Sequence, residues 1–203
     1  VLISTPWVPA MTASRRNVAL LAASQALALS AVVLSMTLAG ILGATLAPDR
    51  GLATLPIALM VVGTALASIP ASMLMRRLGR RAGFMLGAAL GVIGSTLAAI
   101  GLYRQSFGVF VLGHMLIGAY QGFANYYRFA AAEAAGPAHA SRAISWVVAG
   151  GVVAAFAGPQ LGVWGRDWLP PHAFLGSYLA QALLSLSAMV LLSRLALRPV
   201  VVA

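Results

Sequence analysis

The sequence predicts an all-α membrane protein with six transmembrane helices. Of its 203 residues, 61% are hydrophobic and only 8% are charged, whereas about a quarter of the residues in a soluble domain carry a charge. Six apolar runs are each long enough for the roughly 20 residues that a helix needs to cross a bilayer. Their continuous hydrophobicity favours helices over barrel strands, which are shorter and alternate in polarity.

The predicted spans follow one another with short loops, none of which has room for a separate soluble domain. They are Asn17–Leu46, Ala53–Met75, Ala82–Leu102, Phe107–Ala132, Ala143–Trp164 and Ala173–Ser193. We expect residues 1–16 to form a cytoplasmic N-terminal tail and residues 17–194 to form the bundle. Residues 195–203 would begin a cytoplasmic central linker.

The arginines predict the orientation in the membrane. All 13 basic residues are Arg, and cytoplasmic loops carry the excess of positive charge. With the N-terminus inside, the extracytoplasmic side holds only Arg50, Arg104 and Arg166. The cytoplasmic side then holds Arg15, Arg16, Arg76, Arg77, Arg80, Arg81, Arg128, Arg142, Arg194 and Arg198. This bias predicts a multi-pass membrane protein with both termini in the cytoplasm.

The two halves of the chain show signs of an internal repeat. A shift of 89 residues places Pro70 on Pro159 and Arg77 on Arg166. Each half contains three predicted spans, so the second copy must be inverted in the membrane. Two inverted three-helix repeats are the arrangement found within each half of a major facilitator.

Composition also excludes several classes of function. There is no Cys, which excludes disulfides, thiolate metal sites and cysteine nucleophiles. The arginines form short clusters between apolar runs and no continuous basic face, which argues against nucleic-acid binding. An intramembrane enzyme would need a Ser or paired acids beside a base at membrane depth, and no such spacing is present around His114. Met73, Met75, Met115 and His114 itself are residue types that suit copper, but Met also packs ordinary membrane helices. We expect no enzyme activity, cofactor or metal site.

The loop between the second and third spans carries the most informative motif. Its sequence, from Ser72 to Arg81, resembles the major facilitator signature Gly-x-x-x-Asp-Arg-x-Gly-Arg-Arg. The matching residues are Arg77, Gly79, Arg80 and Arg81, whereas Ser72 replaces the Gly and Arg76 replaces the Asp. The resemblance implies a cytoplasmic gate in which these arginines pair with carboxylates at neighbouring helix ends. The alternative is that these arginines only anchor the loop on the cytoplasmic side of the membrane, as positive charge does in other membrane proteins.

Glu133 is the expected carboxylate of this gate, and Arg142 is a further gate candidate. Glu133 is one of only three acids in the chain, and it closes the fourth span on the cytoplasmic side. We expect it to pair with Arg80 or Arg77, against the alternative of a solvated surface acid. An exposed ion pair contributes only about 0 to 1 kcal/mol, so such a contact can be broken during a transport cycle.

The fifth span contains Gly158, Pro159 and Gly162, which resemble the Gly-Pro-x-x-Gly core of a motif in facilitator antiporters. Pro159 removes one backbone hydrogen bond and is expected to bend the helix. The glycines would let a neighbouring helix approach. The motif also occurs outside antiporters, so it predicts no direction of transport.

Polar residues within the spans are candidates for a substrate cavity. Gln121, Asn125 and Arg128 recur at helical spacing in the fourth span. Polar groups in lipid are costly, so this stripe should face protein or a water-filled cavity. His114 is a fourth candidate, either as a proton-linked group or as a neutral hydrogen-bonding residue.

Gln25 and Ser35 complete the candidate cavity residues, because the first helix lines the cavity in facilitators. Ser35 can instead bond back to its own helix.

A more specific resemblance rests on residues 126–133, 141–145 and 150–151, together with residues 70–85. These stretches resemble a branch of bacterial facilitators that includes riboflavin transporters and the copper importers of cytochrome oxidase assembly. The resemblance runs from Met11 to Arg194 and covers the first of two halves. In the copper importers the metal ligands lie in the second half, so no copper ligand is assigned here.

The resemblance implies a secondary active transporter of a small solute, such as riboflavin, that works by alternating access. Its partners would be the solute, the lipid bilayer and a second six-helix half in the same chain or a separate subunit. The alternatives are a copper importer of the same family and a six-helix membrane scaffold or remnant without transport.

Overall fold

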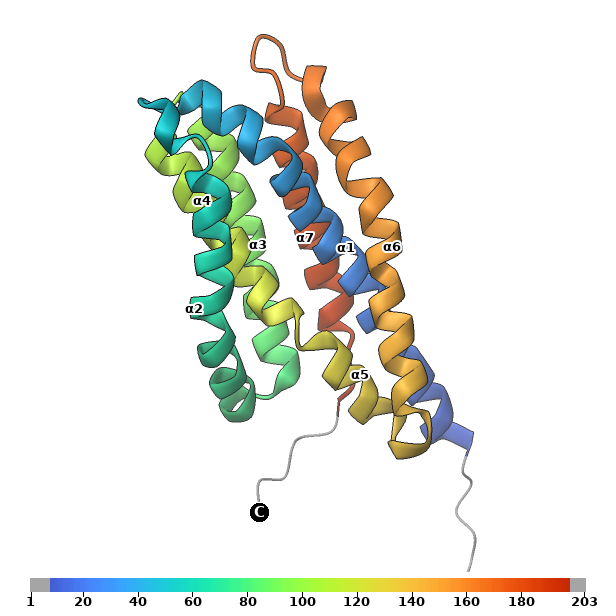
Figure 1. Ribbon diagram of the computed structural model, residues 1–203. Coiled ribbons are helices and arrows are strands. Elements are labelled where there is room, and N and C mark those ends of the chain that lie inside the picture. The colour runs from blue at the N-terminus through green and yellow to red at the C-terminus, as the bar shows by residue number, and fades with distance from the viewer. Residues whose placement is uncertain (1–7, 198–203) are drawn as a thin grey trace, which may run out of the picture.

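The computed structural model describes residues 8–197 as an elongated bundle of helices that run along a common direction (Figure 1). The helices are α1 (Val8–Leu46), α2 (Leu55–Leu78), α3 (Arg80–Tyr103), α4 (Phe107–Ala124), α5 (Tyr127–Ala135), α6 (Ala140–Trp164) and α7 (Leu175–Ser193). Within the described part, six helical segments are long and apolar enough to cross a membrane, α4 and α5 together forming one of them. The predicted all-α, six-span fold is thereby confirmed.

Several boundaries differ from the sequence prediction by two or three residues, and two differences are larger. α1 begins at Val8 rather than at Asn17, so residues 8–16 continue the first span as a helix. The fourth span is interrupted at Asn125 and Tyr126, where the backbone N–H of Tyr126 donates to the carbonyl of Phe123. The N–H of Phe129 likewise donates to the carbonyl of Tyr126. In both bonds the donor and the acceptor are three residues apart rather than four, which tightens the turn and ends the α-helical pattern.

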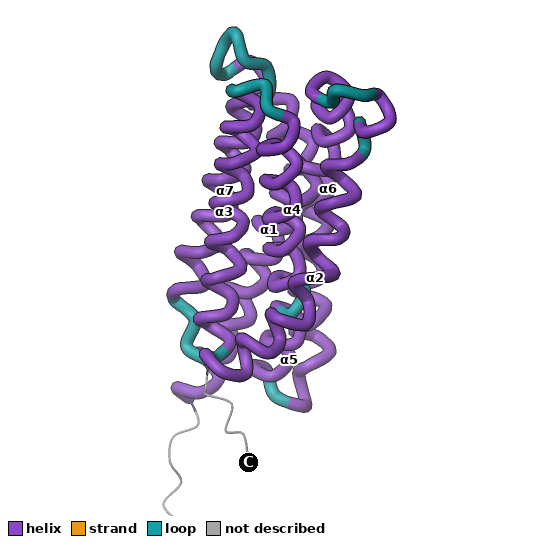
Figure 2. The backbone as a smooth tube through the Cα atoms, turned by 90° about the vertical axis from the view of Figure 1, so that its left-hand side faces the viewer, coloured by secondary structure: helices purple, strands orange, loops and turns teal. Residues whose placement is uncertain are grey.

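Helices of the first half pack mainly against helices of the second half. α2 of the first half lies on α4 of the second, while α6 of the second half lies on α1 of the first. α3 and α7, the last spans of the two halves, pack against each other. Figure 2 shows the loops at the two ends of the bundle, with the α4–α5 turn between them. This packing between the two halves is the pattern expected of two inverted repeats.

Glycines allow these helix pairs to approach closely. A Cβ atom at Gly158 of α6 would lie 2.8 Å from Cβ of Val33 on α1, and one at Gly118 of α4 would lie 2.7 Å from the carbonyl carbon of Met60 on α2. Lipid gives helices no hydrophobic reason to associate, so this close packing is a main source of attraction between them.

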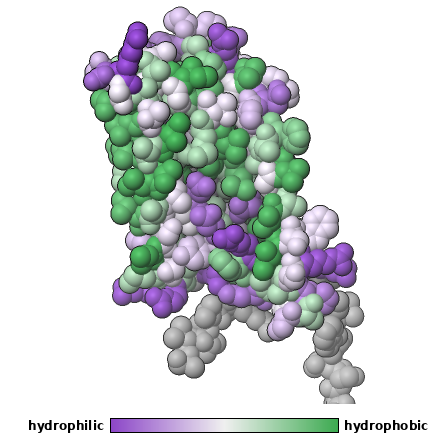
Figure 3. Space-filling model, in the orientation of Figure 1, coloured by the Kyte–Doolittle hydropathy of each residue, from purple (hydrophilic) through white to green (hydrophobic). Residues whose placement is uncertain are grey.

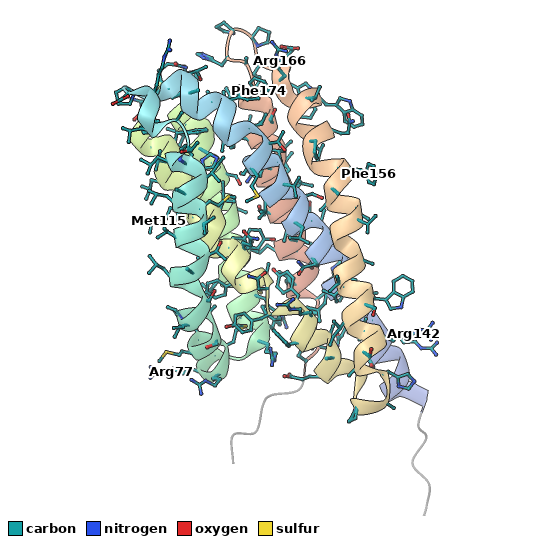
Figure 4. All side chains as sticks on the ribbon, in the orientation of Figure 1. Arg77, Met115, Arg142, Phe156, Arg166 and Phe174 are labelled. Carbon is teal, nitrogen blue, oxygen red and sulfur yellow. The ribbon has the colours of Figure 1, made fainter. Side chains whose placement is uncertain are left out.

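The two ends of the bundle differ in charge. Arg77 and Arg142 lie at one end and Arg166 at the other (Figure 4). We call the first of these the arginine-rich end; it is formed by the start of α1, the α2–α3 loop, α5, the start of α6 and the end of α7. Of the three acids in the sequence, Glu133 lies at this end, on α5.

Candidate functional site

A helix-end ion pair joins α3 to α5 at the arginine-rich end. The guanidinium of Arg80, the first residue of α3, donates to the carboxylate of Glu133. The Arg80 side chain is 20% exposed and that of Glu133 is 56% exposed. The ion pair predicted from the sequence is therefore present, with Arg80 rather than Arg77 as the partner.

The other gate candidates lie on the surface. Arg77, Arg81 and Arg142 are exposed, and within residues 8–197 none of them takes part in an ion pair. Gly79 lies between α2 and α3 and has a φ of 86°. Only glycine adopts this conformation without strain, so Gly79 makes the sharp helix-to-helix turn that presents these arginines.

Polar residues of α2, α4 and α5 lie around the interruption of the fourth span. Gln121 and Asn125 are half-buried and Arg128 is exposed. The hydroxyl of Thr64 on α2 lies 3.4 Å from Oε1 of Gln121 and donates to the Gly118 carbonyl at 2.9 Å. We refer to Thr64, Ser68, Gln121, Asn125, Tyr126 and Arg128 as the α4–α5 polar cluster.

One further hydrogen bond ties this cluster to α2, and Arg128 also contacts its neighbour in sequence. The Tyr126 hydroxyl donates to the Ser68 carbonyl on α2 at 2.9 Å. The guanidinium of Arg128 lies 5.1 Å from the centre of the Phe129 ring, within cation–π range. Figure 3 shows hydrophilic residues gathered on the lower half of this face, within a largely hydrophobic surface. The sequence indicated Gln121, Asn125 and Arg128 but not Thr64 or Ser68, which resemble ordinary polar residues of a packed helix.

His114 lies in the interior of the bundle. Its Nδ1 is 2.9 Å from the Phe110 carbonyl, and its Nε2 is 3.1 Å from the Tyr178 hydroxyl on α7. A carbonyl only accepts, so Nδ1 carries the proton and Nε2 accepts from Tyr178. Both ring nitrogens are thus satisfied in the neutral form, and the side chain is fully buried. This geometry favours the neutral hydrogen-bonding interpretation in the conformation described.

The two candidates on α1 are also buried. The Ser35 hydroxyl contacts the amide of Gln181 on α7, at 2.8 Å from Nε2 and 3.0 Å from Oε1. Gln25 is 8% exposed. Ser35 therefore bonds across to another helix rather than back to its own. Gln181 and Tyr178 were missed in the sequence, because only the helix packing shows which polar residues they meet.

The Gly158–Gly162 motif faces α1. Gly158 and Gly162 are both buried, and the residues nearest to them are Val33, Leu34 and Leu38. α6 continues as a helix through Pro159 to Trp164. In this structure the motif therefore serves close packing between α6 and α1.

A pocket of about 240 Å³ lies at the end of the bundle opposite the arginine-rich end. Its lining comes from α1, the end of α3 and the segment before α7: Ile41, Leu42, Thr45, Leu102, Gln105, Pro171, His172, Ala173 and Phe174. This lining shares no residue with the α4–α5 polar cluster.

Comparison with known proteins identifies a family and a relative. The family of "sugar (and other) transporter" proteins matches residues 17–192. This range includes all or most of each of the six spans. The riboflavin transporter RfnT of Brucella anthropi is 45% identical over 178 residues, which make up 88% of this chain and 45% of that protein. The chain thus spans about half the length of this relative, and both matches are transporters rather than enzymes. On the extent of the family match and the six-span fold, the chain belongs to the sugar (and other) transporter family of the major facilitator superfamily.

Proposed function

We propose that the chain is one half of a secondary active transporter that carries a small solute by alternating access. In such transporters the substrate binds near the middle of the membrane, between two six-helix halves that rock against each other. Membership of a transporter family supports this function. The observation that carries it is the α4–α5 polar cluster, a group of half-buried and exposed polar side chains at a break in a membrane-spanning helix.

We further propose riboflavin as the solute, because a relative named as a riboflavin transporter is 45% identical over 178 residues. The chemistry of the cluster suits this molecule. The amides of Gln121 and Asn125 can each donate to and accept from the carbonyl and imide edge of a flavin ring. Tyr126 and Phe129, whose ring centres lie 6.2 Å apart, offer aromatic faces for the flat ring system.

The second half would cover the face that carries the cluster. On the flanking helices, Ile69 of α2 is 71% exposed and Phe156 of α6 is 74% exposed. Exposed apolar side chains on both sides of a polar cluster suit a partner half that closes over it within the bilayer. The arginine bias supports a cytoplasmic location for the arginine-rich end, and the bacterial source of the relative supports a bacterial inner membrane.

Arg80 and Glu133 would form part of the cytoplasmic gate. The pair joins α5, which also carries Arg128 of the polar cluster, to the start of α3. Because Glu133 is largely exposed, the pair is worth little in stability and can open as the halves rock. The gate would then transmit movement at the cluster to the arginine-rich end.

Riboflavin uptake by cells that cannot make riboflavin tests this proposal. The intact protein should support uptake, while Gln121→Leu and Asn125→Leu should each raise the KM by roughly tenfold or more, as expected for loss of a hydrogen bond to a bound polar group. Gln160→Leu is the matched control, since Gln160 is an exposed amide on α6 outside the cluster. Absence of riboflavin uptake by the intact protein would show that riboflavin is not the solute. Normal KM values in both cluster variants would show that the cluster is not the binding site.

A further inference from the structure

Three buried hydroxyl groups have no hydrogen-bond partner in the described part of the chain. They belong to Ser24 on α1, Tyr120 on α4 and Tyr127 on α5, which are all 0% exposed. One further buried atom lacks a partner, Nε of Arg80, but that guanidinium already bonds to Glu133. A hydroxyl that leaves water without gaining a hydrogen bond is costly, and nearly every buried polar group in a folded protein is bonded to protein or to ordered water. The three hydroxyls therefore indicate a polar partner from outside the described chain.

The three hydroxyl groups lie in the same part of the interior. Tyr120 and Tyr127 belong to one apolar cluster that also contains Leu21 and Ala28 of α1. Ser24 comes three residues after Leu21 and four before Ala28, so it lies on the same face of α1 as both. The two tyrosine hydroxyls are close enough to interact, yet neither meets the geometry of a direct hydrogen bond. α1, α4 and α5 thus bring three unsatisfied hydroxyls into one apolar region.

Ser24 differs from three other buried serines of the bundle. Ser30, Ser95 and Ser185 each donate to the backbone carbonyl four residues earlier, at 2.7 to 3.1 Å. This bond is the ordinary way in which a serine within a helix satisfies its hydroxyl. Ser24 makes no such bond. Its hydroxyl is therefore turned away from the carbonyls of α1, which leaves it available to a group that lies between the helices.

We propose that Ser24, Tyr120 and Tyr127 bind an internal water molecule between α1 and the α4–α5 segment. Buried waters typically form about three hydrogen bonds to polar groups that would otherwise be unsatisfied. A hydroxyl can both donate and accept, so three hydroxyls suit one water. Tyr120 and Tyr127 lie on either side of the interruption at Asn125 and Tyr126, so this water joins both sides of the interruption to α1. The site lies within the six spans of this half and depends neither on a second half nor on the solute.

Radiolytic labelling of the intact protein in nanodiscs, read residue by residue by mass spectrometry, tests the proposal. An X-ray pulse turns a bound water into a hydroxyl radical, which oxidises the side chains beside it even where bulk solvent has no access. Tyr120 and Tyr127 should be oxidised several-fold faster than Tyr178, which is equally buried but whose hydroxyl is bonded to His114. Equal and slow oxidation of the three tyrosines would overturn the water site.

Two serine variants show whether α1 takes part in the site. Ser24→Ala should slow the oxidation of Tyr120 and Tyr127 several-fold, because the water loses one of its partners. Ser30→Ala is the matched control, since Ser30 bonds to its own helix, and it should leave both rates unchanged. Equal rates in the two variants would overturn a site that includes Ser24.

The unfolding temperature in detergent gives a second measurement that does not depend on labelling. Tyr127→Phe should lower it, because the replacement removes a hydrogen bond to the water. A rise would show that the Tyr127 hydroxyl is buried without any partner and would overturn the site. A lower unfolding temperature without oxidation of the wild-type tyrosines would overturn it as well, because it would assign the bond to Tyr120 and Tyr127 themselves. Neither measurement depends on whether the protein carries riboflavin.

Discussion

The side-chain amide of Asn17 forms two hydrogen bonds with the backbone of Ala196, which lies after the last helix. Nδ2 donates to the Ala196 carbonyl at 2.9 Å, and the Ala196 N–H donates to Oδ1 at 3.2 Å. Asn17 is 5% exposed, and Leu195 is 2% exposed within the core. The segment after α7 is therefore hydrogen-bonded to α1, near the start of α1. The segment predicted as linker begins with residues packed on the bundle, and its residues 198–203 lie outside the described part.

Asn17→Ala should release this segment. The replacement removes both hydrogen bonds to Ala196, and since Ala196 is exposed and can bond to water instead, the loss should be about 0.5 to 1.5 kcal/mol per bond at most. Hydrogen exchange in the intact protein should become faster at residues 194–197. Ser14→Ala is the control, because Ser14 donates to the Ala134 carbonyl instead, and it should leave exchange at residues 194–197 unchanged. Unchanged exchange there in Asn17→Ala would show that these hydrogen bonds do not hold the segment.

Two glycines of one motif should respond differently to the same replacement. Gly158→Ala places a Cβ atom 2.8 Å from Val33 and 3.1 Å from the Leu34 nitrogen, an overlap expected to cost about 1 to 3 kcal/mol. Gly162→Ala meets Leu38 at 3.6 Å, an ordinary contact, and should be neutral or slightly stabilising because alanine favours a helix. Thermal unfolding in detergent distinguishes them. Equal unfolding temperatures for the two variants would mean that α6 does not pack on α1 as described.

Ser35 and Gln181 should be energetically coupled. Their side chains meet in the interior, and such pairs in membrane bundles contribute about 0.6 to 1.7 kcal/mol. A double-mutant cycle of Ser35→Ala and Gln181→Leu, measured by unfolding, should therefore give a coupling energy in this range. Strictly additive effects of the two replacements would show that the contact does not form in the bilayer.

The sequence predicted the number and order of the spans because each apolar run is long enough to cross a membrane by itself. It did not predict the interruption at Asn125 and Tyr126, because Gln121, Asn125 and Arg128 recur at helical spacing and so indicate one continuous helix. Nor did it predict that Ser35 meets Gln181 or that Asn17 meets Ala196. Periodicity shows which face of a helix is polar, but the partner depends on how helices far apart in sequence pack together.

The ion pair of Arg80 and Glu133 was predictable for a different reason. Glu133 was the single carboxylate expected near many arginines, so few pairings were open. The choice of Arg80 over Arg77 needed the structure, which places Arg80 at the start of α3 and Arg77 on the exposed face of α2.

Reversing this ion pair tests its role in transport. Arg80→Glu and Glu133→Arg should each lower uptake, because each places like charges at the gate. The double variant should recover part of the uptake, while the unfolding temperature changes little for a pair worth less than about 1 kcal/mol. Failure of the double variant to exceed the single variants would assign the loss to something other than the pair.

The most direct test of the account is labelling of a cysteine placed at the polar cluster. The chain has no Cys, so Asn125→Cys introduces a unique thiol into this half of the protein. Val61→Cys is the control, because Val61 is an apolar residue of α2 that is 58% exposed. A membrane-impermeant maleimide applied from the cytoplasmic side should label Asn125→Cys faster than Val61→Cys, and riboflavin should slow the reaction at Asn125→Cys alone. Equal labelling of both variants, unaffected by riboflavin, would contradict a substrate pathway at this cluster.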